Sequence, residues 1–341
     1  MSLSLVRALR TGSSPRMAFV GAGGKTTAMF RLARALNREQ DTSVIVTATS
    51  HLGSWQISFA DTHIIAESST ALEENKHQLE GVILITGDLD GERTRPLSDQ
   101  TVNWLHQYCD AQSLPLLIEA DGSRQKLLKA WSDNEPPIPP FVNQVVQVVG
   151  ITGVGKPLNS ENVHRPEVFS NLSGLNISEP VTSDALIKVL NHARGGLKNI
   201  PVHARRTLLI NQADTAELQA TALGVARPLL SAFDSVVISS IKQEMIFAVH
   251  EPIAGIILAA GESSRFGEAK QLLDWKGKPF VRAVAMTAVE AGLSPVIVVT
   301  GANAEKVESV VKDLDVEIVR NEDWKSGQGS SIKAAAKVLS M

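Results

Sequence analysis

Short, uninterrupted apolar runs recur along the first 240 residues and constrain the fold more than any other feature of the chain. They lie at residues 17–22, 43–49, 82–87, 114–120, 145–150, 206–212 and 235–240. Strands without polar alternation are typical of a parallel sheet that helices cover on both faces. After the first run, apolar residues recur at helical spacing (Met29, Leu32, Ala33, Leu36), which indicates one buried helix face. We therefore predict an α/β fold built on a parallel sheet.

A second series of elements begins near residue 250. Strands and helices alternate at 255–261, 279–293, 295–301, 304–314, 316–321 and 330–340. This order implies right-handed crossovers and a partial Rossmann-like, doubly wound sheet. We predict one domain at 1–250 and a second at 251–341. Because the second has only three predicted strands, we expect it to be incomplete and to leave one sheet edge unpaired.

The bulk composition excludes several classes of protein. A net charge of −3 provides no basic footprint for nucleic acid. No apolar run reaches the ~18 residues of a membrane span, and Arg7 and Arg10 interrupt the N-terminal apolar patch, unlike a signal peptide. The single cysteine, Cys109, fits no disulfide or zinc spacing and is predicted to be a small buried side chain. We expect a cytoplasmic protein with no nucleic-acid or membrane partner.

The first apolar run leads into a glycine-rich turn, FVGAGGKTT at 19–27. Backbone N–H groups of such a turn, and of the helix that follows, point at phosphates. Lys25 can reach the β- and γ-phosphate oxygens of ATP or GTP, and the Thr26 hydroxyl can ligate Mg²⁺. Phe19 stands where a full P-loop has its first glycine, so the loop is shortened or reshaped. The alternative is a glycine turn for close packing beside a solvated lysine. The predicted phosphate-binding residues are Gly21, Gly23, Gly24, Lys25, Thr26 and Thr27.

Two acidic residues follow the fourth apolar run, in LLIEADGSR at 116–124. Glu119 and Asp121 lie where a parallel sheet presents its ligand-binding edge. One of them can hold Mg²⁺ through water, as a second acidic strand does in P-loop enzymes. Alternatively they cap a helix or pair with Arg124 or Lys126.

The segment LLINQAD at 208–214 places Asn211 and Asp214 directly after a later strand. It resembles the N-K-x-D element with which GTPases read guanine, with Gln212 in the lysine position. A carboxylate there can accept both N–H groups of a guanine edge. A plain turn in which Asp214 caps the next helix is the alternative.

Three further polar residues are candidates for binding. His51 follows the second strand in TATSHLG, and His164 and Arg165 share the polar loop GVGKPLNSENVHRPE at 153–167. Loops that carry such groups on a rigid sheet are common binding sites. Arg165 is predicted to contact an anion; a structural histidine and a solvated loop are the alternatives.

The segments VGAGGKTT, TATSHL, IEADGSRQKLLKA, GKPLNSENVHRPE and INQAD, in this order, resemble the selenium-dependent hydroxylase accessory protein family YqeC. The resemblance covers roughly residues 1–250. It implies a role in maturation of selenium-dependent molybdenum hydroxylases, with such an apoenzyme as a partner, and it implies a pathway more than a reaction.

The loop LAAGESSRFGEAKQLL at 258–273 resembles the signature L-A-A-G-x-S-x-R-[MF]-G-x-x-K-x-L of MobA-like nucleotidyltransferases. Small residues let the backbone approach a nucleotide, and loop amides form a nest for its phosphates. Arg265 and Lys270 are the predicted catalytic cations, since they neutralise the charge on departing pyrophosphate. The predicted nucleotide-binding residues are Leu258, Ala259, Ala260, Gly261, Ser263 and Ser264.

The segment NEDWKSGQGSSIKAA at 321–335 resembles the molybdenum cofactor cytidylyltransferase branch of that superfamily. The resemblance implies CMP transfer from CTP to molybdopterin with release of pyrophosphate. Gly329 and Ser330 are then expected to position the nucleotide or the acceptor, and Ser330 is also predicted to cap the helix that follows. Trp324 is expected either to pack or to touch a ligand.

In this family the next strand ends in an acidic G-D-x-P motif whose Asp ligates Mg²⁺, and no residue after 331 supplies it here. We therefore expect weak nucleotide binding at 258–270 and little turnover by this chain alone, since a metal clamp contributes several kcal/mol in such sites. Two other functions compete with this one: a sugar-nucleotide type of nucleotidyltransferase, and a nucleotide-gated chaperone or scaffold without catalysis.

Overall fold

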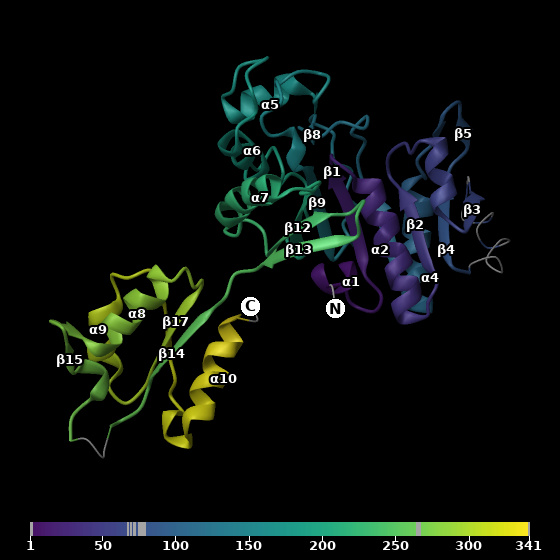
Figure 1. Cartoon of the computed structure of the whole chain (residues 1–341). Coiled ribbons are helices and arrows are strands. Elements are labelled where there is room, and N and C mark those ends of the chain that lie inside the picture. Colours follow the sequence, from purple (N-terminus) through teal and green to yellow (C-terminus); the bar gives the residue numbers. More distant parts are fainter. Residues whose placement is uncertain are drawn as a thin grey trace. The chain divides into compact units, whose positions relative to one another are not determined.

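A computed structural model describes residues 3–66, 68, 70, 73, 80–263 and 267–339. The chain divides into two compact units, residues 1–251 and 252–341, within two residues of the predicted boundary. Figure 1 shows one α/β assembly in each unit. Among the described residues, no helix is both long and apolar enough to cross a bilayer.

Unit 1 is built on a nine-stranded sheet in the order β13-β12-β11-β9-β1-β7-β2-β4-β3. All seven apolar runs form strands of this sheet, and every pair except β12–β13 is parallel. The predicted strands are β1 Arg16–Gly21, β2 Val44–Ala48, β4 Val82–Thr86, β7 Leu116–Glu119, β9 Gln144–Gly150, β11 Arg205–Asn211 and β12 Ser235–Ser240.

Two strands at the sheet edges were not predicted, β3 Thr62–Ile65 and the antiparallel β13 Met245–His250. Both are mostly half-buried or exposed, because an edge strand packs fewer neighbours than a central one. Neither therefore carries the continuous apolar run that marks the central strands.

The helices of unit 1 cover both faces of the sheet (Figure 1). Met17 and Phe19 of β1 pack with α2, while Ala18 and Val20 pack in the cluster that includes Leu105 of α4. This alternation follows the two-residue period of a strand. The helices are α1 Leu5–Ala8, α2 Lys25–Gln40, α4 Asp99–Gln112, α5 Pro166–Ser173, α6 Ser183–Leu190 and α7 Ala216–Leu229.

Short elements connect the main ones. They are the 3₁₀ turns η1 Ser54–Phe59 and η3 Ile151–Gly153, and the strands β5 Leu89–Asp90, β6 Arg93–Thr94, β8 Leu128–Lys129 and β10 Val163–His164. The lone cysteine, Cys109 of α4, is fully buried, and burial raises the pKa of its thiol to about 12. The prediction of a small buried side chain is confirmed.

Unit 2 contains a three-stranded parallel sheet in the order β14-β17-β18, formed by Gly255–Ala259, Val296–Thr300 and Glu317–Arg320. Helices α8 Phe280–Glu290 and α9 Ala304–Val311 pack on one face, and α10 Gln328–Leu339 packs on the other. The minor elements are η4 Lys270–Leu272, β15 Asp274–Trp275, β16 Lys278–Pro279 and η5 Trp324–Ser326. This arrangement agrees with the predicted Rossmann-like fold.

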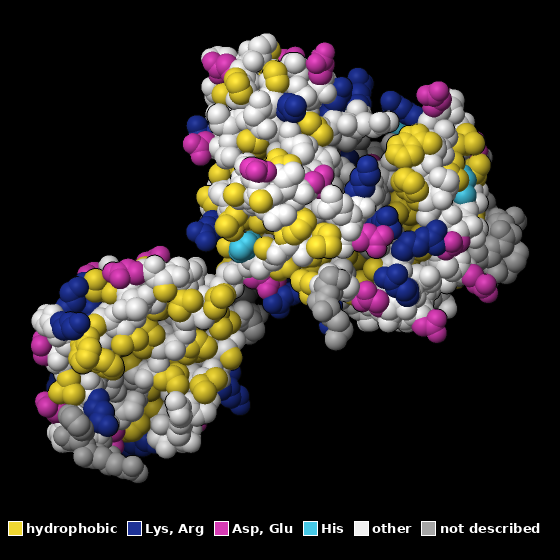
Figure 2. Space-filling view, in the orientation of Figure 1, with side chains coloured by type: hydrophobic (Ala, Val, Ile, Leu, Met, Phe, Trp, Pro, Cys, Tyr) yellow, Lys and Arg dark blue, Asp and Glu magenta, His cyan; other side chains and the backbone are white. Residues whose placement is uncertain are grey.

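The apolar surface of unit 2 is incompletely covered. Figure 2 shows hydrophobic side chains spread across the visible face of this unit. Ile256 and Leu258 of the edge strand β14 are 38% and 36% exposed. In the described part of the chain β14 pairs with β17 alone, as expected for a sheet with an open edge.

We predict that Leu32→Ala lowers the free energy of unfolding by about 2–5 kcal/mol, because it leaves a cavity in a fully buried site between α2 and the sheet. Val202→Ala is the control, since Val202 is 92% exposed and its truncation should change stability by less than about 0.5 kcal/mol. Urea unfolding followed by circular dichroism measures both. A change below about 1 kcal/mol for Leu32→Ala would contradict this core.

Candidate phosphate site and its relatives

The loop between β1 and α2 lies at the point where the sheet reverses its strand order. From β1 the chain proceeds to β2 and β4 on one side, while β9, β11 and β12 lie on the other. In open α/β sheets ligands bind at such a point, outside the carboxyl ends of the strands. The topology therefore places the predicted phosphate loop where a ligand crevice is expected.

This loop requires glycine at three positions. Gly21, Gly23 and Gly24 have φ values of 99°, 81° and 116°, in the left-handed region that other residues rarely adopt. A Cβ on Gly23 would lie 2.2 Å from the Gly150 nitrogen, and one on Gly24 would lie 2.5 Å from Asn211 Nδ2. The loop thus packs directly against β9 and β11, and this close packing fixes its path.

The N–H groups of the loop divide into two sets. Those of residues 21–23 donate to groups of the chain, among them the Asp121 carboxylate and the Val148 carbonyl. Those of residues 24–27 have no acceptor in the part of the chain that the structure describes. Unpaired N–H groups at a helix start carry partial positive charge and bind anions. The start of α2 therefore presents donors suited to a phosphate group.

Lys25, the first residue of α2, is buried beside this helix start. Its Nζ donates to the Gly21 carbonyl at 2.9 Å and lies 3.1 Å from Asp121 Oδ1 and 3.7 Å from Glu119 Oε1. Burial alone would lower the pKa of Lys25, but the two carboxylates raise it above its ordinary value. The alternative of a solvated lysine is therefore wrong, because Lys25 is a buried cation, 3% exposed.

Asp121 joins the loop to the sheet. Its carboxylate accepts the Gly21 N–H at 3.0 and 3.1 Å and the Trp131 indole N–H at 2.7 Å, and it pairs with Lys25 and with Lys129 at 3.0 Å. Burial would raise the pKa of Asp121, yet the two lysines and the Gly21 N–H hold it below its usual range. Every observed partner of Asp121 is a nitrogen donor, so it acts as an acceptor that locks the loop.

Glu119 and Thr26 form the neighbouring oxygen pair. The Thr26 hydroxyl donates to Glu119 Oε2 at 2.5 Å, and burial raises the pKa of Glu119 although Lys25 opposes the shift. A hydroxyl and a carboxylate are the oxygen ligands that Mg²⁺ takes in P-loop enzymes. This pair fits the predicted metal role better than the nitrogen-bound Asp121. Within the described residues, no group of three or more acidic, histidine or cysteine side chains forms a metal cluster.

The cationic partners of the two carboxylates are Lys25 and Lys129, and not Arg124 or Lys126 as in the alternative interpretation. Arg124 lies in a left-handed turn, φ 50°, and Lys129 follows on β8, which pairs with β10 in a separate two-stranded sheet. Sequence reasoning missed Lys129, although a lysine inside the apolar segment LLKAW was a signal of a buried charge.

The ion-pair network extends beyond the loop. Lys129 Nζ also donates to the Gly122 carbonyl at 2.5 Å and lies 3.2 Å from Glu135 Oε2, and Glu135 pairs with Arg165. Charges of alternating sign thus run from Arg165 to Lys25. Arg165 is predicted to contact an anion; the anion it contacts in this structure is Glu135.

The two candidate histidines lie in different surroundings. His51 is exposed, and its Nδ1 lies 2.9 Å from the Thr94 carbonyl oxygen. His164 of β10 pairs in register with Lys129 of β8. Burial, together with the positive charges of Lys129 and Arg165, lowers the pKa of His164 to about 4. His164 therefore remains neutral near pH 7 beside the network.

Asn211 supports the loop from the end of β11. Its side-chain amide donates to the Gly23 carbonyl at 2.8 Å and accepts the Ile241 N–H at 2.9 Å. Asp214 is exposed, and the alternative in which it caps α7 is wrong, because the Thr215 hydroxyl accepts the Leu218 N–H instead. The guanine-reading role of Asn211 and Asp214 stays a prediction, with both ends of the Asn211 amide already bonded.

In unit 2, one side chain organises the loop after β14. Gln271 Nε2 donates to the carbonyls of Ala259 and Gly261, at 3.1 and 2.6 Å. The Ser263 hydroxyl donates to Gln271 Oε1 at 3.2 Å and accepts the Lys270 N–H at 3.1 Å. Sequence reasoning did not single out Gln271, which the loop signature treats as a variable position.

The remaining predicted residues of this loop are only partly described. Ala260 is 4% exposed and Leu258 is 36% exposed. Ser264 and Arg265 lie outside the described residues, so their predicted roles in nucleotide binding and catalysis stay predictions.

The predicted cap at Ser330 is wrong. Helix α10 begins at Gln328, so Ser330 lies inside its first turn, where its hydroxyl accepts from Asn321 Nδ2 at 2.8 Å. The exposed Gly329 precedes it in the same turn. Trp324 packs against the cluster that contains Ala260, which agrees with the packing alternative.

The chain thus combines an α/β unit, with a glycine loop where the strand order reverses, and a smaller Rossmann-like unit. Residues 17–167 match the YqeC protein family. The protein YqeC of Escherichia coli (strain K12) is 30% identical over 204 residues, which are 58% of this chain and 76% of that protein. The chain belongs to the YqeC family.

Residues 255–340 match the MobA-like NTP transferase domain. Nicotine blue oxidoreductase of Paenarthrobacter nicotinovorans is 40% identical over 83 residues, 24% of this chain and 41% of that protein. A "Probable molybdenum cofactor guanylyltransferase" of Bacillus cytotoxicus is 30% identical over 77 residues, 23% of this chain and 37% of that protein. The chain thus spans well under half the length of these two relatives. Their names differ in class, so similarity alone does not fix a reaction for unit 2.

We predict that stability falls as the pH is lowered from about 6.5 to about 4, with His164 as one cause. The pKa of this ring is depressed in the folded state. Between about pH 6.5 and pH 4 the unfolded chain therefore binds a proton at His164 that the folded protein does not bind. His164→Gln should flatten the fall in urea midpoint between pH 7 and pH 5. An unchanged slope in the variant would contradict the described environment of this ring.

Proposed function

We propose that unit 1 binds the triphosphate of ATP or GTP at the start of α2. The observation that supports this most strongly is the set of unpaired N–H groups of residues 24–27 beside the buried Lys25. In the complex, Lys25 turns from Asp121 toward the phosphate oxygens. Asp121 stays compensated, because Lys129, the Gly21 N–H and the Trp131 indole remain bound to it.

Mg²⁺ is the proposed metal of this site. Thr26 and Glu119 are the residues that would hold it, since their oxygens already lie 2.5 Å apart. When bound, the ion neutralises negative charge on the nucleotide phosphates. Glu119 would then give up its hydrogen bond to the Thr26 hydroxyl in exchange for the metal.

The intact domain to which unit 2 belongs is proposed to carry nucleotidyl transfer from CTP to a molybdopterin-type acceptor, with weak nucleotide binding and little turnover expected of this chain alone. An acceptor phosphate oxygen attacks the α-phosphorus and a new P–O bond forms. The bond between the α-phosphorus and the oxygen that bridges it to the β-phosphorus breaks, and pyrophosphate leaves. Arg265 and Lys270 compensate the charge on the pyrophosphate. The MobA-like domain and the printed name of the Bacillus relative support the acceptor class. The same name makes GTP the competing donor.

The proposed pathway is maturation of a molybdenum hydroxylase, with its apoenzyme as the partner. This part rests on the segments shared with the YqeC family. A nucleotide-gated scaffold without catalysis is the alternative. The scaffold alternative predicts that Lys25→Ala abolishes partner binding and that no product is detected even from the intact nucleotidyltransferase domain.

The phosphate site is tested by the pair Thr27→Pro and Thr27→Ala in the full chain. Proline at this first-turn position removes one unpaired N–H and breaks no hydrogen bond of the helix, whereas alanine keeps the N–H. We expect Thr27→Pro to weaken ATP or GTP binding about tenfold or more, because it removes one hydrogen bond to a charged group. Thr27→Ala should leave the affinity nearly unchanged. Calorimetry measures both. Equal affinities in the two variants would contradict the proposal.

The second site is tested separately by Lys270→Gln, with Lys276→Gln as the control that removes a nearby surface charge. CTP binding should weaken about tenfold in Lys270→Gln and remain intact in Lys276→Gln and Thr27→Pro. Stronger binding of GTP than of CTP at the site that depends on Lys270 would overturn the assignment of CTP.

A further inference from the structure

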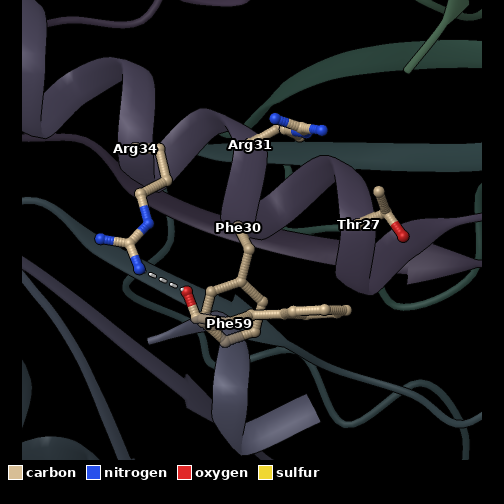
Figure 3. A pocket seen from close by; sticks show the side chains of 5 residues that line it. All are labelled: Thr27, Phe30, Arg31, Arg34 and Phe59. Carbon is tan, nitrogen blue, oxygen red and sulfur yellow. Dashed lines mark hydrogen bonds between the residues drawn. The ribbon is translucent and has the colours of Figure 1, made fainter. Parts of the chain in front are cut away.

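An aromatic pocket lies on the side of α2, directly after the residues that form the phosphate site. Its lining consists of Thr27, Phe30, Arg31 and Arg34 of α2, and of Phe59 at the end of η1. The four helical residues are spaced i, i+3, i+4 and i+7, so they share one helix face. Figure 3 shows the rings of Phe30 and Phe59 close together, with the Arg34 guanidinium at one end of the pocket and Thr27 toward the other.

Phe59 gives the pocket its partly exposed ring, and the buried Phe30 packs edge-to-face against it. The Phe30 and Phe59 centroids lie 5.5 Å apart with their planes at 70°, and Trp55 meets Phe59 edge-on at 5.6 Å. Phe30 is 4% exposed and therefore fixed in the core, whereas Phe59 is half-buried and Trp55 is 54% exposed. Aromatic faces of this kind stack on nucleic-acid bases, because every base has a π-face.

Both arginines are held in place by their partners. Arg34 pairs with Asp61 and donates from Nη2 to the Phe59 carbonyl at 2.8 Å, and Arg31 pairs with Glu244. A guanidinium fixed at the rim of an aromatic pocket can stack on a ring or donate to the acceptor atoms of a purine. The pocket thus combines apolar walls with oriented donors, the usual composition of a small-molecule site.

The size and position of the pocket indicate one part of a nucleotide rather than a whole one. Its volume is about 210 Å³, below the roughly 300–1,000 Å³ of complete ligand sites. Thr27 belongs both to the unpaired helix start and to the pocket wall, and Phe30 follows it by about 4.5 Å along the helix axis. A ligand with phosphates at the helix start can therefore place its base against the accessible ring of Phe59.

We propose that this pocket is the base subsite of unit 1 and receives the purine ring of the nucleotide whose phosphates bind residues 24–27. This inference rests on the proposed phosphate site and adds the element that distinguishes a nucleotide from inorganic phosphate. It assigns base recognition to α2 and η1, and not to Asn211 and Asp214 at the end of β11. ATP and GTP share the ring chemistry, and separate titrations distinguish them.

The test compares ATP, GTP and inorganic tripolyphosphate on the full chain by calorimetry. Phe59→Leu removes one ring face and should weaken purine nucleotide binding about tenfold while leaving tripolyphosphate binding within twofold. Phe59→Tyr keeps the ring and should retain the affinity for nucleotide. Trp104→Leu is the matched control, since this ring stacks on Tyr108 in α4, far along the chain from the pocket.

Photolabelling of the wild-type chain with 8-azido-ATP decides the question independently of the folding of any variant. Label is expected on tryptic peptides 26–31 and 39–76, which contain Phe30 and Phe59, and excess ATP should suppress it. Two results would overturn the base subsite. One is label in unit 1 that is confined to peptides outside these two. The other is an equal loss of ATP and tripolyphosphate affinity in Phe59→Leu, together with no label on these two peptides. If Thr27→Pro left the affinities for ATP, GTP and tripolyphosphate unchanged, the phosphate site itself would be overturned.

Discussion

The carboxylate of Asp121 is the group on which the first site depends. It is fully buried, and a buried ion is tolerated only when paired and hydrogen-bonded. Two lysines, one backbone N–H and one indole N–H meet these requirements. Because the partners come from β1, α2, β8 and the segment after it, satisfying this one charge also fixes the path of the glycine loop. The unpaired N–H groups at the start of α2 then follow directly after this fixed loop, since the first N–H groups of a helix have no partner within it.

Asp121 pairs with two lysines, Lys25 and Lys129, and this duplication is what the proposed function of Lys25 requires. A lysine that served as the sole partner of a buried carboxylate could not leave it without a large penalty, of about 3–5 kcal/mol. Lys129 shares the charge of Asp121, so Lys25 is able to exchange that contact for a phosphate. The chain of alternating charges from Lys129 through Glu135 to Arg165 connects the loop to the start of α5.

Much of the fold and part of the site could be predicted from the sequence. Central strands such as β1 and β9 carry continuous apolar runs, because helices cover both of their faces, whereas the edge strand β13 carries no such signal. Gly23 and Lys25 were identified from the glycine-rich turn after β1, and Asp121 because it lies near the end of a strand. The partners of those residues were not identified from the sequence. Lys129 and Glu135 reach the site through a long connection whose path depends on tertiary packing. Thr215 caps α7 one residue after Asp214, and α10 begins at Gln328, two residues before Ser330, which is the usual uncertainty of a helix end.

Amide hydrogen exchange of the glycine loop tests the central claim most directly. If Asp121 holds the loop, Asp121→Ala should raise the exchange rate of the Gly21 amide at least tenfold, while amides of unit 2 strands such as β17 keep their wild-type rates. The same rate for Gly21 in the variant and the wild-type protein would contradict the account, because the loop would then keep its path without this carboxylate.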